Sequence, residues 1–248
     1  DPARIENWIA TFNDARLPQL IDEAVTENPG ILSAEARIRA ARASARAANA
    51  GRLPGVSADL GVTQRETDAG GSTSYGAGLG VSWEADLWAR LAARAQAGVL
   101  EYEATDADYD GARLSVAGQV ARAWFLLIEA RLQTDLAARD VETKRRSLGL
   151  IERRFGAGVS RSSDVRTFRS ALASSEAVLA SRQRAQASAA RSLEILLGRY
   201  PAGNIEHEAD LPEFTALSGI GAPGELLSRR PDLRAAEARL QAAGLQAE

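Results

Sequence analysis

A stretch of about 70 residues, from Leu87 to Phe155, contains no proline and is predicted to form one uninterrupted helix. At 1.5 Å per residue, such a helix would be about 100 Å long, far longer than the helices of globular domains. Its apolar residues recur every seven positions in two rows, which is typical of a coiled coil. The rows are Tyr102, Tyr109, Val116, Ala123, Ala130 and Ala137, and Val120, Leu127, Val141, Leu148 and Phe155. The fold class is therefore predicted to be mainly α and built on a rod.

The rod is predicted to end at Gly156-Ala157-Gly158, and side chains from Ser160 to Asp164 are suited to cap a new helix. A returning helix is predicted from about Ser163 to Leu197, about half as long as the first helix. The two should form an antiparallel hairpin. Before the rod, helix-forming residues from Leu17 to Asn49 are interrupted at Asn28-Pro29-Gly30, so two shorter helices are expected there.

Between these helical segments the apolar period changes to two, which predicts two strands joined by a loop containing Gly70-Gly71. Each strand should be about ten residues long, enough to cross a bilayer at a tilt. The apolar set is Val56, Ala58, Leu60, Val62, Tyr75, Ala77, Leu79, Val81 and Trp83. A soluble hairpin with one face on a core fits the period too. However, a lone hairpin is only marginally stable, so its partner strands should come from other copies or subunits.

One phrase of the sequence occurs twice, about 200 residues apart. Residues 34–41 read AEARIRAA and residues 236–243 read AEARLQAA, each at the same distance after a proline, Pro29 or Pro231. Solenoid repeats have periods of about 20–50 residues, so this spacing predicts two copies of a whole structural unit. The chain holds one unit and the opening helix of the next.

Composition excludes several kinds of function. The net charge is -3 with both signs interspersed along the helices, so nucleic acid is not an expected partner. The chain has no cysteine and a single histidine, His207, so we expect no metal and no cofactor. The sequence contains no run of 18 apolar residues, so no membrane-spanning helix is predicted. The chain begins at Asp1 and lacks methionine, so the natural start is expected to lie upstream, as would any signal peptide or lipid-bearing cysteine.

Two local patterns resemble catalytic sites but have simpler explanations. Gly76-x-Gly78-x-Gly80 lacks the spacing of a nucleotide-binding loop and falls within a predicted strand. Glu84 and Asp86 are close carboxylates, but they immediately precede the long helix, where acidic side chains cap and stabilise the helix start. No catalytic set is evident, so the protein is not expected to be an enzyme.

Four phrases resemble the TolC-type outer membrane factors of bacterial efflux systems, in the lipoprotein branch typified by OprM and NodT. The strand-to-helix phrase is residues 82–90, SWEADLWAR, in which Ala89 stands where the family commonly has glycine. Residues 158–165 resemble the tip of the family's helical hairpin, residues 196–201 its end-of-helix phrase, and residues 227–233 the start of its second repeat.

The resemblance implies a homotrimer in which each protomer gives strands to a shared transmembrane β-barrel and helices to an α-barrel tunnel in the periplasm. The implied function is the outer membrane channel of a tripartite efflux system, a passive duct served by a periplasmic adaptor protein and an inner-membrane pump. The resemblance also divides this chain into five segments. They are residues 1–54, an N-terminal segment and upper helices; 55–86, the transmembrane hairpin; 87–199, the helical hairpin; 200–224, an irregular equatorial segment; and 225–248, the start of a second repeat.

By the same resemblance, the turn of the helical hairpin contacts the adaptor. The candidate residues are Gly156, Gly158, Val159, Ser160, Ser163, Asp164 and Val165. The apolar strand face would meet outer membrane lipid. Glycine, serine and aspartate are also what any tight helix-to-helix turn requires. The contact hypothesis predicts that Gly158→Trp leaves folding and trimerisation intact but abolishes export. Arg153 and Arg154, just before the turn, fit either a charged constriction or an ordinary surface pair.

A protein of a different class fits the same residues: a soluble coiled-coil scaffold whose strand hairpin mediates assembly. Such a scaffold would stay soluble without detergent, whereas a membrane channel would not. An enzyme domain inserted among helices is a third alternative, disfavoured because no catalytic set is present. The exported substrate and the pump that is served are not encoded in any motif of the chain.

Overall fold

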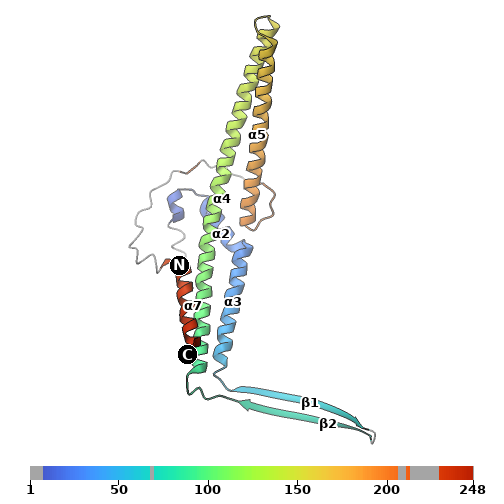
Figure 1. Cartoon of the computed structure of the whole chain (residues 1–248), viewed down its shortest axis with the longest axis vertical. Coiled ribbons are helices and arrows are strands. Elements are labelled where there is room, and N and C mark those ends of the chain that lie inside the picture. Colours follow the sequence, from blue (N-terminus) through green and yellow to red (C-terminus); the bar gives the residue numbers. More distant parts are fainter. Residues whose placement is uncertain (1–7, 68–69, 206–210, 213–228, 248) are drawn as a thin grey trace. The chain divides into compact units, whose positions relative to one another are not determined.

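The computed structural model describes residues 8–67, 70–205, 211–212 and 229–247 (Figure 1). It is mainly helical with one antiparallel strand pair, as predicted. Its elements are η1 (Ala10–Phe12), α2 (Leu17–Glu27), α3 (Pro29–Ala50), β1 (Gly55–Thr67), β2 (Gly70–Ser82), α4 (Arg90–Gly156), α5 (Ser162–Leu196) and α7 (Pro231–Ala247). Most of the predicted irregular segment 200–224, including His207, lies outside the described residues.

The predicted helices are present with small shifts at their ends. α4 has 67 residues and α5 has 35, so the returning helix is about half as long as the outgoing one. The interruption at Asn28 separates α2 from α3. α3 and α7 both start at the proline that precedes the repeated phrase, since proline is well tolerated in the first turn of a helix. The two copies of the phrase therefore have the same secondary structure.

The chain divides into two compact units, and the first combines residues 1–32 with 112–220. Its core is formed where α2 and the end of α5 pack on the middle of α4. Trp124 is its largest fully buried side chain, with an exposed fraction of 1%. Other core members are Leu17, Leu20, Ile21, Val120, Leu127, Ile128, Leu193 and Leu197. Burying these apolar side chains supplies the main driving force for folding of this unit.

Polar side chains at the margin of this core satisfy backbone and ring groups. Asp14 accepts the indole N–H of Trp124 at 2.7 Å, and its other oxygen accepts the backbone N–H of Leu17 at the start of α2, at 2.9 Å. The Asn28 side chain donates to the carbonyl of Leu196 at 2.8 Å. The buried Glu194 accepts backbone N–H groups after α5, including that of Gly203 at 2.6 Å. Each contact replaces water that burial removes.

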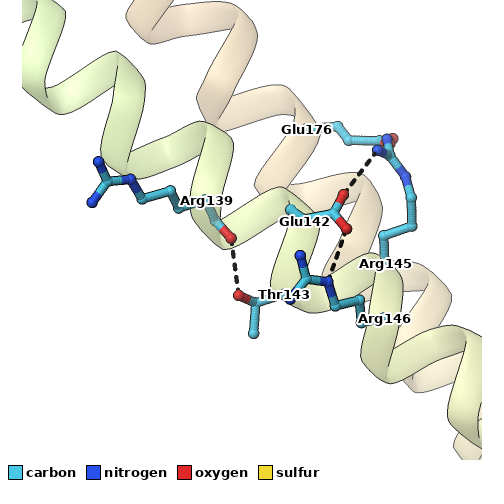
Figure 2. Close-up of polar contacts among 6 residues, drawn as sticks. All are labelled: Arg139, Glu142, Thr143, Arg145, Arg146 and Glu176. Carbon is cyan, nitrogen blue, oxygen red and sulfur yellow. Dashed lines mark hydrogen bonds and ion pairs between the residues drawn. The ribbon is translucent and has the colours of Figure 1, made fainter.

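Beyond that core, ion pairs connect α4 and α5 in addition to the buried Val141 of α4 and Val165 of α5. Figure 2 shows Arg145 of α4 beside Glu176 of α5, with the guanidinium 3.2 Å from the carboxylate. Arg169 and Glu152 make a second inter-helix pair at 2.7 Å. Exposed ion pairs contribute little stability each, on the order of 0–1 kcal/mol, so they align the helices more than they stabilise them.

The second unit combines residues 33–111 with 221–248. Here α3 and α7 both pack on the first part of α4 through small side chains. Ala104 and Ala107 of α4 are buried against Ala235 of α7. A Cβ added at Gly98 would lie 3.3 Å from the Cβ of Ala48 in α3, so the two helices approach closely there. Ion pairs, such as Arg234 with Asp110 at 3.2 Å, border the α7 contact.

The strand pair also belongs to the second unit. β1 and β2 have 13 residues each, longer than the ten predicted, because polar residues next to the loop also pair. Among the described residues these two strands form a sheet of their own, so the outer edge of each has no neighbouring strand. Every described side chain of β2 is exposed. The expectation that this hairpin has no sheet within the chain is confirmed for this part of the molecule.

Candidate functional site

The register of the strand pair places the predicted apolar residues on one face. Residues opposite each other in an antiparallel pair point to the same side. The pairs are Val56 with Val81, Ala58 with Leu79, Leu60 with Ala77, and Val62 with Tyr75. The valine, leucine and tyrosine side chains in these pairs are 68–88% exposed. The hairpin thus carries an apolar face that the described part of the chain leaves uncovered.

The opposite face is small and polar. Ser57, Asp59 and Gly61 pair with Gly80, Gly78 and Gly76, so the three glycines lie within a strand and not in a phosphate-binding loop. The apolar face ends sharply, since the next pair towards the loop is Gln64 with Thr73. Four apolar pairs thus alternate with three small or polar pairs, so the strands together form one apolar face and one polar face.

The last predicted member of the apolar set, Trp83, lies one residue beyond β2. Its indole N–H donates to the carbonyl of Arg52 at 3.2 Å, while the side chain remains 63% exposed. The prediction that Trp83 belongs to the strand is therefore wrong by one residue. The reason is that pairing starts at Gly55 with Ser82, so Trp83 has no partner in β1.

The junction between β2 and α4 is built by the two carboxylates that the sequence suggested as caps. The Asp86 carboxylate accepts the backbone N–H groups of Leu91 at 2.9 Å and Ala92 at 2.8 Å. The hydrogen bond from Leu91 is the main reason that the pKa of Asp86 lies below its ordinary value. Glu84 instead pairs with Arg90 at 2.8 Å. Both acids are thus occupied in structural contacts.

Ala89 explains why α4 begins at Arg90 and not at the predicted Leu87. Its φ of +57° lies in the left-handed region, which glycine adopts freely and alanine adopts at a cost of about 1 kcal/mol. The helical backbone starts only after this residue. The departure from the family's glycine therefore falls at the one position of this junction where glycine is sterically favoured.

At the other end of α4, the turn of the helical hairpin has the geometry of a Schellman motif. The N–H of Gly158 donates to the carbonyl of Phe155 at 2.9 Å, and that of Val159 donates to Arg154 at 3.0 Å. Gly158 has φ +78°. Any side chain at Gly158 strains the turn itself, so Gly158→Trp would change the turn as well as the surface proposed to contact the adaptor.

The start of α5 is capped by Asp164. One carboxylate oxygen accepts the backbone N–H of Arg161 at 3.1 Å and the hydroxyl of Ser160 at 3.0 Å. These bonds, the first above all, hold the pKa of Asp164 below its ordinary value. The predicted capping role of this segment is confirmed by these contacts.

The seven predicted turn residues differ in accessibility. Gly156, Gly158, Val159 and Ser163 are exposed, and Ser160 and Asp164 are half-buried. Val165 is only 7% exposed, so its side chain packs within the hairpin. Arg153 and Arg154 are both exposed, and so are Arg161 and Arg166, which sequence reasoning did not single out. The density of basic residues on both sides of the turn was the signal that could have found them.

Among the described helices, none is both long enough and apolar enough to span a membrane. The chain belongs to the outer membrane efflux protein family, whose model matches residues 20–199. The resemblance predicted from the sequence is thereby confirmed. The pyoverdine export outer membrane protein OpmQ of Pseudomonas aeruginosa is 30% identical to this chain over 260 residues. That alignment covers 98% of this chain and 54% of OpmQ.

Solved structures show the same fold. The outer-membrane channel OprN is 33% identical, with a TM-score of 0.81 over 96% of this chain and 56% of OprN. The outer membrane protein VceC from Vibrio cholerae is 26% identical, with a TM-score of 0.79 over 97% of this chain and 59% of VceC. The chain thus spans about half the length of the relatives it matches, and its fold is that of TolC-like outer membrane channels.

Proposed function

We propose that the whole protein is the outer membrane channel of a tripartite efflux system, a passive duct with no covalent chemistry of its own. It acts as a homotrimer with a periplasmic adaptor protein and an inner-membrane pump. The observation that carries the proposal is the strand hairpin. Its apolar face is uncovered and its outer edges are unpaired among the described residues, in a chain of this family.

The chemistry of the hairpin fits insertion into a closed, lipid-embedded barrel. Unpaired backbone groups are costly in hydrocarbon, and closing strands from several protomers into a barrel pairs every edge. The face with Leu60 and Leu79 would then meet lipid, and the face with Gly76, Gly78 and Gly80 would line the lumen. Small lumen side chains leave room for solutes.

The predicted division of the chain is part of the same proposal. Residues 55–86 form the transmembrane hairpin and residues 87–199 form the helices of a periplasmic tunnel. Residues 1–54 supply upper helices, 200–224 an equatorial segment, and 225–248 the start of a second repeat. The turn around Gly158 and Val159 contacts the adaptor, and the protein resides in the outer membrane.

The test places the same charge on the two faces of β1. Leu60→Arg puts a guanidinium on the apolar face, which should cost about 2–4 kcal/mol near the bilayer midplane. Gly61→Arg is the matched control, because an added Cβ there meets nothing within 4 Å and points to the opposite face. The measurement is the amount of trimer in the outer membrane fraction of cells that express the whole protein.

We expect Leu60→Arg to lower the inserted trimer at least about tenfold and Gly61→Arg to leave it close to wild type, given the cost of charge at the lipid face. Equal insertion of the two variants would refute a lipid-facing role for the apolar face. Recovery of the wild-type protein in the soluble fraction without detergent would instead favour the coiled-coil scaffold.

A further inference from the structure

We infer that one face of α3 is an interface for a second copy of the whole protein, where it packs on the long helix of the partner's second repeat. This small-residue face is defined here as Ser33, Ala36 and Ala40, with Leu32 and Arg37 at its two edges. The inference rests on the proposed homotrimer and adds which residues join its protomers and what chemistry those residues meet.

The repeated phrase relates α3 to α7 residue by residue. Residues 34–41 match residues 236–243, and both helices begin at the proline that precedes the phrase. Equivalent residues lie on equivalent faces, because both segments are helical throughout. These two opening helices can therefore be compared for what covers each face.

The small-residue face is exposed on α3 and buried on α7. The equivalents of its three residues on α7 are Ala235, Ala238 and Ala242. Ala235 and Ala242 are each 0% exposed, and Ala238 packs against the cluster of Ala235 with Ala104 and Ala107 of α4. The three residues on α3 are all exposed. One copy of this face therefore packs on a long helix, whereas the other copy is left uncovered by the residues that the structure describes.

The opposite face of each opening helix shows the reverse. On α3 this face contacts α4, where Glu35 accepts the hydroxyl of Tyr109 at 3.3 Å. Ile38, on the same face, is half-buried. Its equivalent on α7, Leu240, is 74% exposed. Taken together, the two helices indicate that an opening helix in the whole protein has a long helix against each of its two faces.

The two contacts of α4 lie on nearly opposite sides of that helix (Figure 1). Gly98 and Tyr109 face α3, whereas Ala104 and Ala107 face α7. At 3.6 residues per turn, these two sets are about 150° apart around the helix axis. The three helices therefore form a row that bends only slightly, which the two repeats of one chain are too few to close. Contacts between unlike surfaces of successive copies close such a row into a ring.

The order of the repeats identifies the helix of the partner. α7 opens the second repeat and packs on the long helix of the first repeat, α4. By the same order, α3 packs on the long helix of a second repeat, and in a ring that repeat belongs to the neighbouring copy. This chain covers 54% of OpmQ, so relatives of this family are long enough to hold such a helix.

Arg37 indicates the charge that this partner helix carries. Its equivalent on α7, Arg239, pairs with Asp108 at the edge of the buried face. Arg37 is exposed and makes no ion pair within the described part of the chain. Because guanidinium groups bind carboxylates in a directional, bidentate fashion, we expect an aspartate or glutamate on the partner helix at the position equivalent to Asp108.

Leu32 makes this contact different from the one within the chain. The equivalent residue of α7 is Arg234, which lies 3.2 Å from Asp110. Leu32 is uncharged and 46% exposed, and packing it on a carboxylate would leave that carboxylate without a partner. We therefore expect an uncharged residue on the partner helix at the position equivalent to Asp110. This difference favours the second repeat of the neighbour over its α4.

The first experiment joins the two helices covalently in the whole protein. Ser33→Cys is combined with a cysteine at the position of the second repeat that is equivalent to Ala107. The matched control combines Ala235→Cys with Ala107→Cys, because Ala235 is the equivalent of Ser33 and packs with Ala107 inside one chain. A disulfide requires Cα atoms within about 7 Å of each other. Oxidised membranes are analysed on a denaturing gel without reductant, and free thiols are counted.

We expect the Ser33 pair to give a covalent species as large as the trimer, which returns to single chains on reduction. The control pair should lose its free thiols but remain the size of one chain. A Ser33 disulfide within one chain would overturn the inference, because α3 would then pack on its own second repeat. Absence of the Ser33 link where the control pair reacts would overturn it too.

The second experiment reverses the charge at the edge of the face. Arg37→Glu should lower the amount of detergent-stable trimer about tenfold, because the ring repeats the repulsion at every contact. Arg46→Glu, at an exposed position of α3 outside the face, should leave the trimer close to wild type. Arginine at the second-repeat position equivalent to Asp108 should restore the trimer of Arg37→Glu. Equal losses at Arg37 and Arg46, or no restoration, would contradict the assigned ion pair.

Export separates this inference from the proposed function. If deleting the whole protein leaves export by intact cells unchanged, the proposed function fails, whatever the cysteine pairs show. If the protein supports export as an outer membrane trimer but the Ser33 pair links no neighbouring chains, only the inference fails.

Discussion

The strand hairpin and the helical hairpin differ in how far their apolar side chains are buried. Along α4, the apolar residues Val120, Trp124 and Leu127 are buried by other segments of the same chain. Along β1, Val56, Leu60 and Val62 are paired in register but remain 68–88% exposed. The middle of α4 therefore has a packed core within the chain, whereas the apolar face of the strand hairpin is left uncovered by the residues that the structure describes.

The largest effect that separates the two regions should come from their tryptophans. Trp124→Ala removes a side chain that is 1% exposed and leaves Asp14 without its indole partner, so we expect a loss of about 3–5 kcal/mol in the free energy of unfolding. Trp83→Ala, at the end of the strand hairpin and 63% exposed, should cost no more than about 1 kcal/mol. Denaturant unfolding of the purified protein, followed by helical circular dichroism, measures both. Similar losses at the two positions would contradict the comparison.

A smaller effect, of opposite sign at the two ends of α4, should follow from its left-handed residues. Ala89 precedes α4 with φ +57°, and Gly158 follows it with φ +78°. Ala89→Gly should stabilise the protein by about 0.5–1 kcal/mol because it relieves the strained backbone, and Gly158→Ala should destabilise it by a similar amount. The same unfolding measurement tests both. Stabilisation by both substitutions would show that φ at these positions does not control stability.

The smallest expected effect is a loss of stability at low pH. The pKa values of Asp86 and Asp164 lie below their ordinary values in the folded protein. Their stabilising contribution is therefore complete above the ordinary carboxyl pKa of about 3.9 and is lost as pH falls through the lowered folded values. Helical circular dichroism should fall between about pH 4 and about pH 2, and less steeply in Asp164→Asn, whose side-chain oxygen still accepts hydrogen bonds. An unchanged slope in that variant would show that the cap does not contribute.

The regular elements were predictable from sequence because period and chain breakers determine them locally. The seven-residue spacing of Val120, Leu127 and Val141 identified buried positions of α4. The alternation from Val56 to Val62 gave the strand face, and the register confirms that the second strand matches it. Glycine at 158 and proline at 29 and 231 marked where helices end or begin.

Other features were missed because they depend on contacts between distant segments. The strict heptad rows omitted Trp124 and Ile128, which are buried because α2 also covers the middle of α4 and widens the buried stripe. Ala104 and Ala107 are buried by α7, more than 120 residues later in the chain. Val165 was predicted both as an adaptor-contacting turn residue and as an apolar position of the returning helix, and its 7% exposure fits the second prediction. No local pattern distinguishes the other residues named here from exposed ones.

The register of the strand pair also fixes a hydrophobic height. From Val56 to Val62 the apolar face advances by about 20 Å along the strand, and the tilt of strands in closed barrels reduces the height to about 15 Å. This is less than the apolar band of about 25 Å in outer membrane proteins. For the lipid-facing role proposed above, the bilayer would have to be thinned next to this face, or other apolar groups such as the exposed Trp83 would have to extend the band. The four apolar cross-strand pairs therefore set a hydrophobic height that is smaller than this band.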